Sequence, residues 1–124
     1  MSMFALGVRG SFAAAHRLES YEGKCEALHG HNFFVETLYE GDGLNKDGML
    51  VDFKILKENL RDVLNTLDHT YINEIPFFSG RASSSEYIAM YVFEELEKLL
   101  QGSRVSLKEV RVWESGDAYA AYRK

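Results

Sequence analysis

The pattern of apolar and polar positions divides the chain into two strands, two helices and two further strands. Residues 4–16 alternate loosely, contain no proline and predict one long strand. Residues 31–39 (HNFFVETLY) are rich in aromatic and β-branched side chains and predict a second strand. The polar, glycine-containing residues 18–28 predict a loop between them, and the Gly-Asp-Gly of residues 41–43 ends the second strand.

Two helices are predicted to follow. Asp52 is a predicted N-cap, and apolar residues recur after it at helical spacing as far as Leu67. Ser83 and Glu86 match a capping box at the start of a second apolar-periodic run, and Gly102 is its predicted end. Residues 71–80, between the two helices, predict a connecting loop.

The last part of the chain returns to strand patterns. Residues 105–113 alternate well, with a slip near Lys108 and Glu109, and residues 118–122 predict a short final strand. Short turns between neighbouring strands imply antiparallel pairing. The sequence therefore predicts an α+β domain with both helices on one face of the sheet.

Composition and charge narrow the class of protein. A length of 124 residues fits one domain, residues 1–124, and 46% apolar residues suffice for one core. A net charge of −5 argues against a nucleic-acid partner, which calls for a basic surface. The single cysteine, Cys25, excludes an internal disulfide and favours a reducing compartment. With no signal-peptide pattern and no run long enough to span a membrane, we expect a cytoplasmic protein without a membrane partner.

The histidines are the strongest sign of chemistry. In a strand, His29 and His31 point to the same side, so both imidazoles can reach one metal ion, and Gly30 lets the backbone come close. His16, at the end of the first strand, can supply a third ligand if the two strands pair. Three imidazoles leave one coordination position open, as catalytic zinc requires. The alternative is three ordinary histidines without a metal.

Cys25 precedes His29 by four residues and has three interpretations. It can be a fourth ligand that closes a structural zinc site. It can instead stand beside the metal as a base, because a nearby divalent ion favours the thiolate. The third interpretation is a small buried core residue.

Two further carboxylates are candidates for function. Asp68 beside His69 can fix the tautomer of the imidazole and raise its basicity, although a histidine at a helix C-terminus is also favoured by the helix dipole alone. Glu114 follows an otherwise apolar strand, and a carboxylate there can accept two parallel N–H bonds from a guanidine-like ligand edge. Its alternative is a solvated strand end.

Taken together, the motifs resemble those of the 6-pyruvoyltetrahydropterin synthase and 6-carboxytetrahydropterin synthase family. They follow one another at the family's spacings over nearly the whole chain. The motifs are His16 in AAHRL, Cys25-x-x-x-His29-Gly-His31, residues 48–53 (GMLVDF), Leu67-Asp-His69 and Trp113-Glu-Ser.

The resemblance implies a tunnelling fold, in which a four-stranded antiparallel sheet carries two helices on one face. It also implies a homohexamer, built as a dimer of trimers, with active sites between subunits. It implies that His16, His29 and His31 bind a zinc ion. Around this ion it implies Cys25 as general base, Asp68 and His69 as a proton relay, and Glu114 as the residue that binds the pterin ring. The substrate in this family is 7,8-dihydroneopterin triphosphate.

The chain departs from the family pattern at two places. Relatives often read Pro-Thr-x-Glu-Asn at the second helix, where this chain has Ser83-Ser84-Ser85-Glu86-Tyr87, so Ser84 is expected to keep a hydroxyl at the ring. Glu26 follows the cysteine directly. Family members that cleave the substrate side chain to 6-hydroxymethyl-7,8-dihydropterin carry a glutamate near this position. Glu26 therefore indicates either a second base and dual activity, or one more charge on an acidic loop.

The expected function is zinc-dependent conversion of 7,8-dihydroneopterin triphosphate to 6-carboxy-5,6,7,8-tetrahydropterin, with loss of acetaldehyde and triphosphate, in queuosine biosynthesis. Within the family, the alternatives are side-chain cleavage for folate biosynthesis and the 6-pyruvoyltetrahydropterin synthase reaction. A non-catalytic zinc-binding module, with Cys25 as fourth ligand, is the alternative of another class.

Overall fold

Secondary structure follows the order ββααββ that the apolar pattern predicts. The computed structural model describes residues 3–17 and 29–124. Strands and α-helices are β1 (Phe4–His16), β2 (His29–Gly41), α1 (Phe53–Asn65), α2 (Ser85–Leu99), β3 (Ser106–Ser115) and β4 (Ala118–Arg123). Two short 3-10 helices, η1 (Ile72–Glu74) and η2 (Pro76–Phe78), lie where the sequence predicts only a loop.

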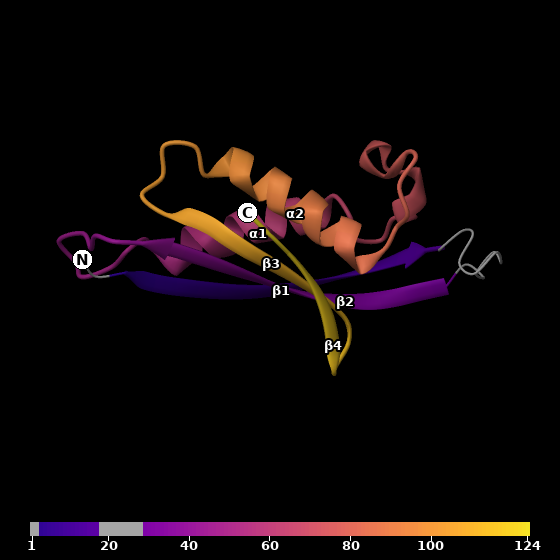
Figure 1. Cartoon of the computed structure of the whole chain (residues 1–124), viewed down its shortest axis with the longest axis horizontal. Coiled ribbons are helices and arrows are strands. Elements are labelled where there is room, and N and C mark those ends of the chain that lie inside the picture. Colours follow the sequence, from indigo (N-terminus) through magenta and orange to yellow (C-terminus); the bar gives the residue numbers. More distant parts are fainter. Residues whose placement is uncertain (1–2, 18–28) are drawn as a thin grey trace.

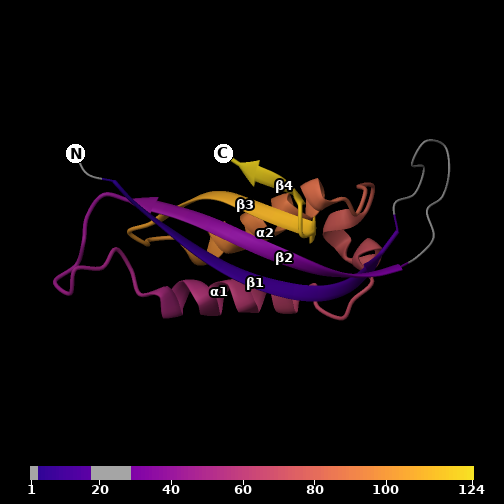
Figure 2. The same ribbon diagram turned by 90° about the horizontal axis from the view of Figure 1, so that it is seen from below.

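The four strands form one antiparallel sheet in the order β1-β2-β3-β4. Both α-helices lie on the same side of this sheet, so the predicted α+β architecture is confirmed (Figure 1). Helix α1 packs against β1, and α2 packs against β3 and β4 (Figure 2). Among the described residues, no helix has the length and apolar character needed to cross a membrane.

Alternation along β1 sorts its side chains between two faces. Val8 and Phe12 are buried beneath the helices, whereas Arg9 is exposed on the opposite, open face. Gly10 lies on the helix side, where a Cβ atom would stand 2.9 Å from Leu64 Cδ1 of α1. The missing side chain therefore lets α1 approach the sheet closely.

Strand β3 contains two irregularities. Leu38 of β2 pairs with Glu109 and Tyr39 pairs with Leu107, so Lys108 is an extra residue on β3. This bulge confirms the slip that the sequence pattern indicates near Lys108. A second register shift, in the pairing of β3 with β4, leaves Glu114 as the extra residue. Bulges of this kind re-aim side chains and are frequent beside functional sites.

Caps fix where the two helices begin. Asp52 is the N-cap of α1, and its carboxylate accepts a hydrogen bond of 2.9 Å from the Lys54 backbone N–H, as predicted. The N-cap of α2 is Ser84, one residue later than the predicted capping box. Ser83 is instead fully buried and bonds to other segments. The sequence pattern is off by one because three consecutive serines offer equivalent caps.

Candidate functional site

The pairing of β1 with β2 gathers the predicted ligand positions at one end of the sheet. His16 stands opposite His29 in the register, and Ala14 stands opposite His31. His16 and His31 share the helix-covered face with Phe33, which packs against both rings. The side chain of His29 lies outside the described part of the structure. The start of α2 lies over this end of the sheet (Figure 1).

Three side chains from three strands converge there. One ligand atom from each of His16, His31 and Glu114 lies within 4.8 Å of the other two. Nε2 of His16 is 3.2 Å from Glu114 Oε1, and Nε2 of His31 is 4.0 Å from the same oxygen. The His16 side chain is only 1% exposed, whereas His31 and Glu114 are 32% and 41% exposed. The cluster is thus anchored in the core and open toward solvent.

The chemistry of these donors suits a divalent metal ion. Nδ1 of His16 lies 2.8 Å from the Ser83 carbonyl oxygen, which only accepts, so Nδ1 carries the proton. In the neutral imidazole, Nε2 then presents a lone pair toward the Glu114 carboxylate. A cation shared by these lone pairs stabilises the arrangement, and imidazole and carboxylate are the ligands of many catalytic zinc sites. The residues therefore fit zinc.

Glu114 is predicted to bind a ligand ring, and the structure also brings its carboxylate within reach of the two histidines. It follows Val110 and Val112, which are buried on the helix-covered face, and it is the extra residue of the second bulge. The same carboxylate also lines a hollow with His31 and with Ser85 and Glu86 of α2. Glu114 can therefore serve the metal position and a ligand in the hollow.

Glu86 is a candidate binding residue that the sequence analysis did not select. It is exposed in the first turn of α2 and lines the hollow beside Glu114. Ser84, the predicted ring contact, uses its hydroxyl to accept a hydrogen bond of 3.3 Å from the Tyr87 backbone N–H. The capping pattern in the sequence could have indicated Glu86, because it places this residue in the first turn of α2, and that turn faces the histidine cluster.

Asp68 and His69 form a separate pair at the outer edge of β1. Asp68 Oδ1 accepts a hydrogen bond of 2.8 Å from the Ala13 backbone N–H, and Asp68 Oδ2 lies 2.8 Å from His69 Nδ1. His69 adopts a left-handed backbone conformation, with φ of 59°, and its own N–H bonds to the Ala13 carbonyl oxygen at 2.6 Å. These contacts lock the pair onto the strand.

The position of this pair suits proton transfer. Because Asp68 holds the Nδ1 proton of His69, Nε2 of His69 is left as the basic atom. The His69 side chain is 83% exposed and lines a hollow together with Gly30 and His31, but it is not part of the metal cluster. The Ala13 N–H, followed by the His69 ring, lowers the pKa of Asp68 below its usual range, which keeps the carboxylate charged.

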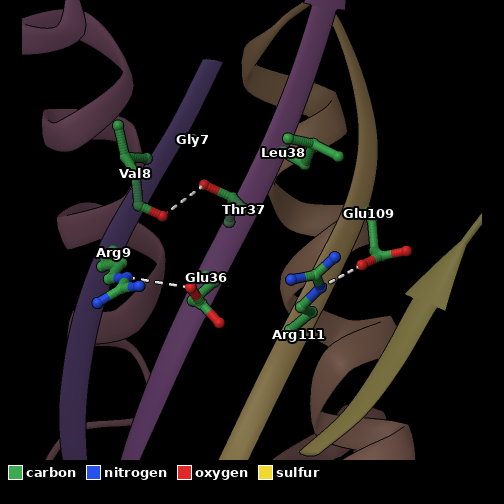
Figure 3. Close-up of a pocket in the computed structure, with 8 residues that line it drawn as sticks. All are labelled: Gly7, Val8, Arg9, Glu36, Thr37, Leu38, Glu109 and Arg111. Carbon is green, nitrogen blue, oxygen red and sulfur yellow. Dashed lines mark hydrogen bonds and ion pairs between the residues drawn. The ribbon is translucent and has the colours of Figure 1, made fainter. Parts of the chain in front are cut away.

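A further hollow lies on the open face of the sheet, away from the histidines (Figure 3). Oppositely charged side chains pair across its floor. Arg9 Nε lies 3.0 Å from Glu36 Oε2, and Glu109 pairs with both Arg111 and Arg123. The charges of these side chains neutralise one another, so this hollow has fewer charged groups left to bind a ligand than the histidine end of the sheet.

Two predicted catalytic residues belong to the part of the chain that the structure does not describe. Cys25 and Glu26 lie outside the described residues, as does the side chain of His29. Their roles therefore stay predictions.

Comparison with known proteins adds to this geometry. Residues 5–124 match the model of the family described as 6-pyruvoyl tetrahydropterin synthase. The 6-carboxy-5,6,7,8-tetrahydropterin synthase of Synechocystis sp. is 37% identical over 117 residues, which cover 90% of this chain and 87% of the relative. The dihydroneopterin monophosphate aldolase of Pyrococcus furiosus is 37% identical over 109 residues, which cover 88% of both chains.

Solved structures give the same picture of the fold. The 6-pyruvoyl tetrahydropterin synthase of Caenorhabditis elegans superposes with a TM-score of 0.86 at 29% identity. The superposition covers 100% of this chain and 97% of that one. The likeness therefore extends over the whole sheet and both helices.

The lowered pKa of Asp68 predicts how Asp68→Asn changes stability with pH. A carboxyl group whose pKa is lowered in the folded state stabilises the fold above its unfolded pKa of about 4. That contribution is lost as the pH falls through the lower folded-state value. We expect the variant to be less stable than the wild type from about pH 5 upward, with the difference shrinking below about pH 4, since a protonated aspartate resembles asparagine. Urea unfolding at a series of pH values measures this, and a difference independent of pH would contradict it.

Proposed function

Because the chain belongs to the 6-pyruvoyl tetrahydropterin synthase family, we propose that it is a zinc-dependent lyase acting on a pterin. The proposed reaction converts 7,8-dihydroneopterin triphosphate to 6-carboxy-5,6,7,8-tetrahydropterin with loss of acetaldehyde and triphosphate, as a step of queuosine biosynthesis in the cytoplasm. The observation that carries the proposal is the cluster of His16, His31 and Glu114 beside an open hollow. The Synechocystis relative, which is named 6-carboxy-5,6,7,8-tetrahydropterin synthase, supports this choice of reaction.

We propose that His16, His29 and His31 hold the zinc ion. Support comes from the convergence of His16 and His31 and from the register that sets His29 opposite His16. Bound zinc supplies Lewis-acid polarisation of a substrate oxygen. The exposure of His31 and Glu114 leaves this side open to a substrate, which argues against the alternative of a closed, non-catalytic zinc module.

The remaining roles fall to residues around the cluster. Cys25 is the proposed base that removes a proton from the substrate side chain. His69, oriented by Asp68, exchanges a proton through its Nε2 atom. Glu114 accepts hydrogen bonds from the N–H groups of the pterin ring in the hollow, and Glu86 on its other wall offers a second carboxylate for the same edge. Ser84 keeps the start of α2 in place beside the ring.

A second reaction is supported by a specific relative. The Pyrococcus furiosus protein is named an aldolase of dihydroneopterin monophosphate, and it is 37% identical to this chain. We therefore keep side-chain cleavage to 6-hydroxymethyl-7,8-dihydropterin, for folate biosynthesis, as the alternative activity, with Glu26 as its base. The 6-pyruvoyltetrahydropterin synthase reaction remains the third candidate within the family.

The proposed assembly is a homohexamer, a dimer of trimers. Strands β1 and β4 are the two edges of the sheet, and open edges are normally paired or covered. His69 is exposed beside the β1 edge, so a subunit joined there would enclose the Asp68–His69 pair and keep water from it. Light scattering on the purified protein at micromolar concentration should give the mass of six chains. A monomer would contradict the assembly.

Metal analysis tests the ligand set. We expect about one zinc ion per chain. His31→Ala should lose both the metal and the activity, because it removes a ligand. His69→Ala is the matched control, since it also removes an imidazole near the hollow but not from the cluster, and it should keep the metal while losing activity. Elemental analysis after dialysis measures both, and stoichiometric zinc in His31→Ala would show that the ligand assignment is wrong.

Product identification after incubation with 7,8-dihydroneopterin triphosphate tests the reaction. Cys25→Ala should lower formation of 6-carboxytetrahydropterin by roughly 10²–10⁴-fold, the usual contribution of a general base, with zinc still bound. If Glu26 is the base of the second activity, this variant should still release 6-hydroxymethyl-7,8-dihydropterin, and Glu26→Ala should abolish that product alone. Unchanged products in Glu26→Ala would end the dual-activity proposal, and zinc loss in Cys25→Ala would make the cysteine a ligand.

A further inference from the structure

The orientation of the His16 ring is set from behind the metal cluster. This side chain is almost fully buried, and its Nδ1–H donates a hydrogen bond of 2.8 Å to the backbone carbonyl oxygen of Ser83. That bond fixes the tautomer and leaves Nε2, on the far side of the ring, facing Glu114. The position of one carbonyl group, just before α2, therefore decides which nitrogen of His16 meets a metal.

Ser83 is held by contacts with two other segments. It is fully buried, and its hydroxyl lies 2.9 Å from Asn73 Oδ1 and 3.1 Å from the Arg17 carbonyl oxygen. Its single hydrogen is shared between these acceptors. The residue before α2 is thus tied to the end of β1 and to η1 at once.

Asn73, in η1, joins all three segments. Its Oδ1 accepts a hydrogen bond of 3.0 Å from the Arg17 backbone N–H, and its Nδ2 donates one of 2.8 Å to the Arg17 carbonyl oxygen. The side-chain amide thereby pairs with both polar groups of one backbone residue, as a neighbouring strand would. Because Arg17 directly follows His16, the clamp fixes the backbone that carries the ligand as well as the serine that orients it.

We propose that Asn73 is a positioning residue of the metal site. Its amide holds the end of β1 against Ser83, so that His16 keeps the Nδ1–H tautomer and presents Nε2 to the metal. The inference rests on the proposed function in one respect, namely that a metal binds at His16. Groups that orient a histidine ligand in this way typically change metal affinity by 10–100-fold when they are removed.

The test compares Asn73→Ala with the wild type in zinc affinity and in the tautomer of His16. Competition with a chromophoric chelator should show zinc binding weakened by roughly 10–100-fold. Asn73→Asp keeps the Oδ1 acceptor but sets a second carboxylate oxygen against the Arg17 carbonyl oxygen, so it should also weaken zinc binding, and it serves if the alanine variant fails to fold. Asn45→Ala is the matched control. Asn45 Oδ1 accepts hydrogen bonds of 2.9 and 3.0 Å from the Asp47 and Met49 backbone N–H groups in the turn after β2, so its removal also costs a backbone clamp. It should leave zinc affinity unchanged.

A readout on the metal-free protein separates this proposal from the proposed function. Long-range proton–nitrogen NMR correlations report the tautomer of each histidine ring. We expect the Nδ1–H form for His16 in the wild type and in Asn45→Ala, and a mixture of tautomers in Asn73→Ala. If the wild type binds no zinc, the proposed function fails while the tautomer comparison still decides the role of Asn73. Wild-type zinc affinity in Asn73→Ala, an unchanged His16 tautomer in that variant, or an equal loss in Asn45→Ala would overturn the proposal.

Discussion

The structure depends on the long antiparallel pairing of β1 with β2. This pairing extends from Phe4 opposite Gly41 to His16 opposite His29 without a register shift. It fixes two things together, because alternation along each strand assigns the apolar residues to the helix-covered face and the histidines to the last positions of that same face. A slip by one residue would expose the core and separate the ligands at the same time. Burial of the core and formation of the histidine site therefore depend on the same register of β1 and β2.

The sequence predicts the parts of the molecule that depend on local periodicity. Strand alternation locates β1 and predicts that His29 and His31 point to one side of a strand. The carboxylate of Asp52 marks the start of α1. Even the slip near Lys108 is visible, since the alternation breaks there. These features need only near neighbours in the chain, so a single sequence contains them.

Contacts between distant segments are what the sequence cannot supply. In the sequence, Asn73 looks like an ordinary polar loop residue and Ser83 like a helix cap, and only the fold brings both to the end of β1 behind His16. The distance from Glu114 to His16 likewise requires three strands in register and a bulge. Which serine of residues 83–85 caps α2 also depends on the burial of Ser83 in that network. In each case the deciding energy is a hydrogen bond or a packing contact between segments that are distant in the chain.

The bulge at Lys108 decides on which face of the sheet the Glu114 side chain lies. Leu107 and Glu114 are seven positions apart, and in a regular strand an odd separation places two side chains on opposite faces. The extra residue removes one step from this count, so that Val110, Val112 and Glu114 join Leu107 on the helix-covered side. Deleting Lys108 would leave six positions between Leu107 and Glu114 in a regular strand, so both side chains would keep the helix-covered face. Pairing all of the residues regularly, without the bulge, would instead send the carboxylate to the face of the ion pairs. The bulge, rather than the side chain of residue 108, lets a β3 of this length bring Glu114 to the histidines.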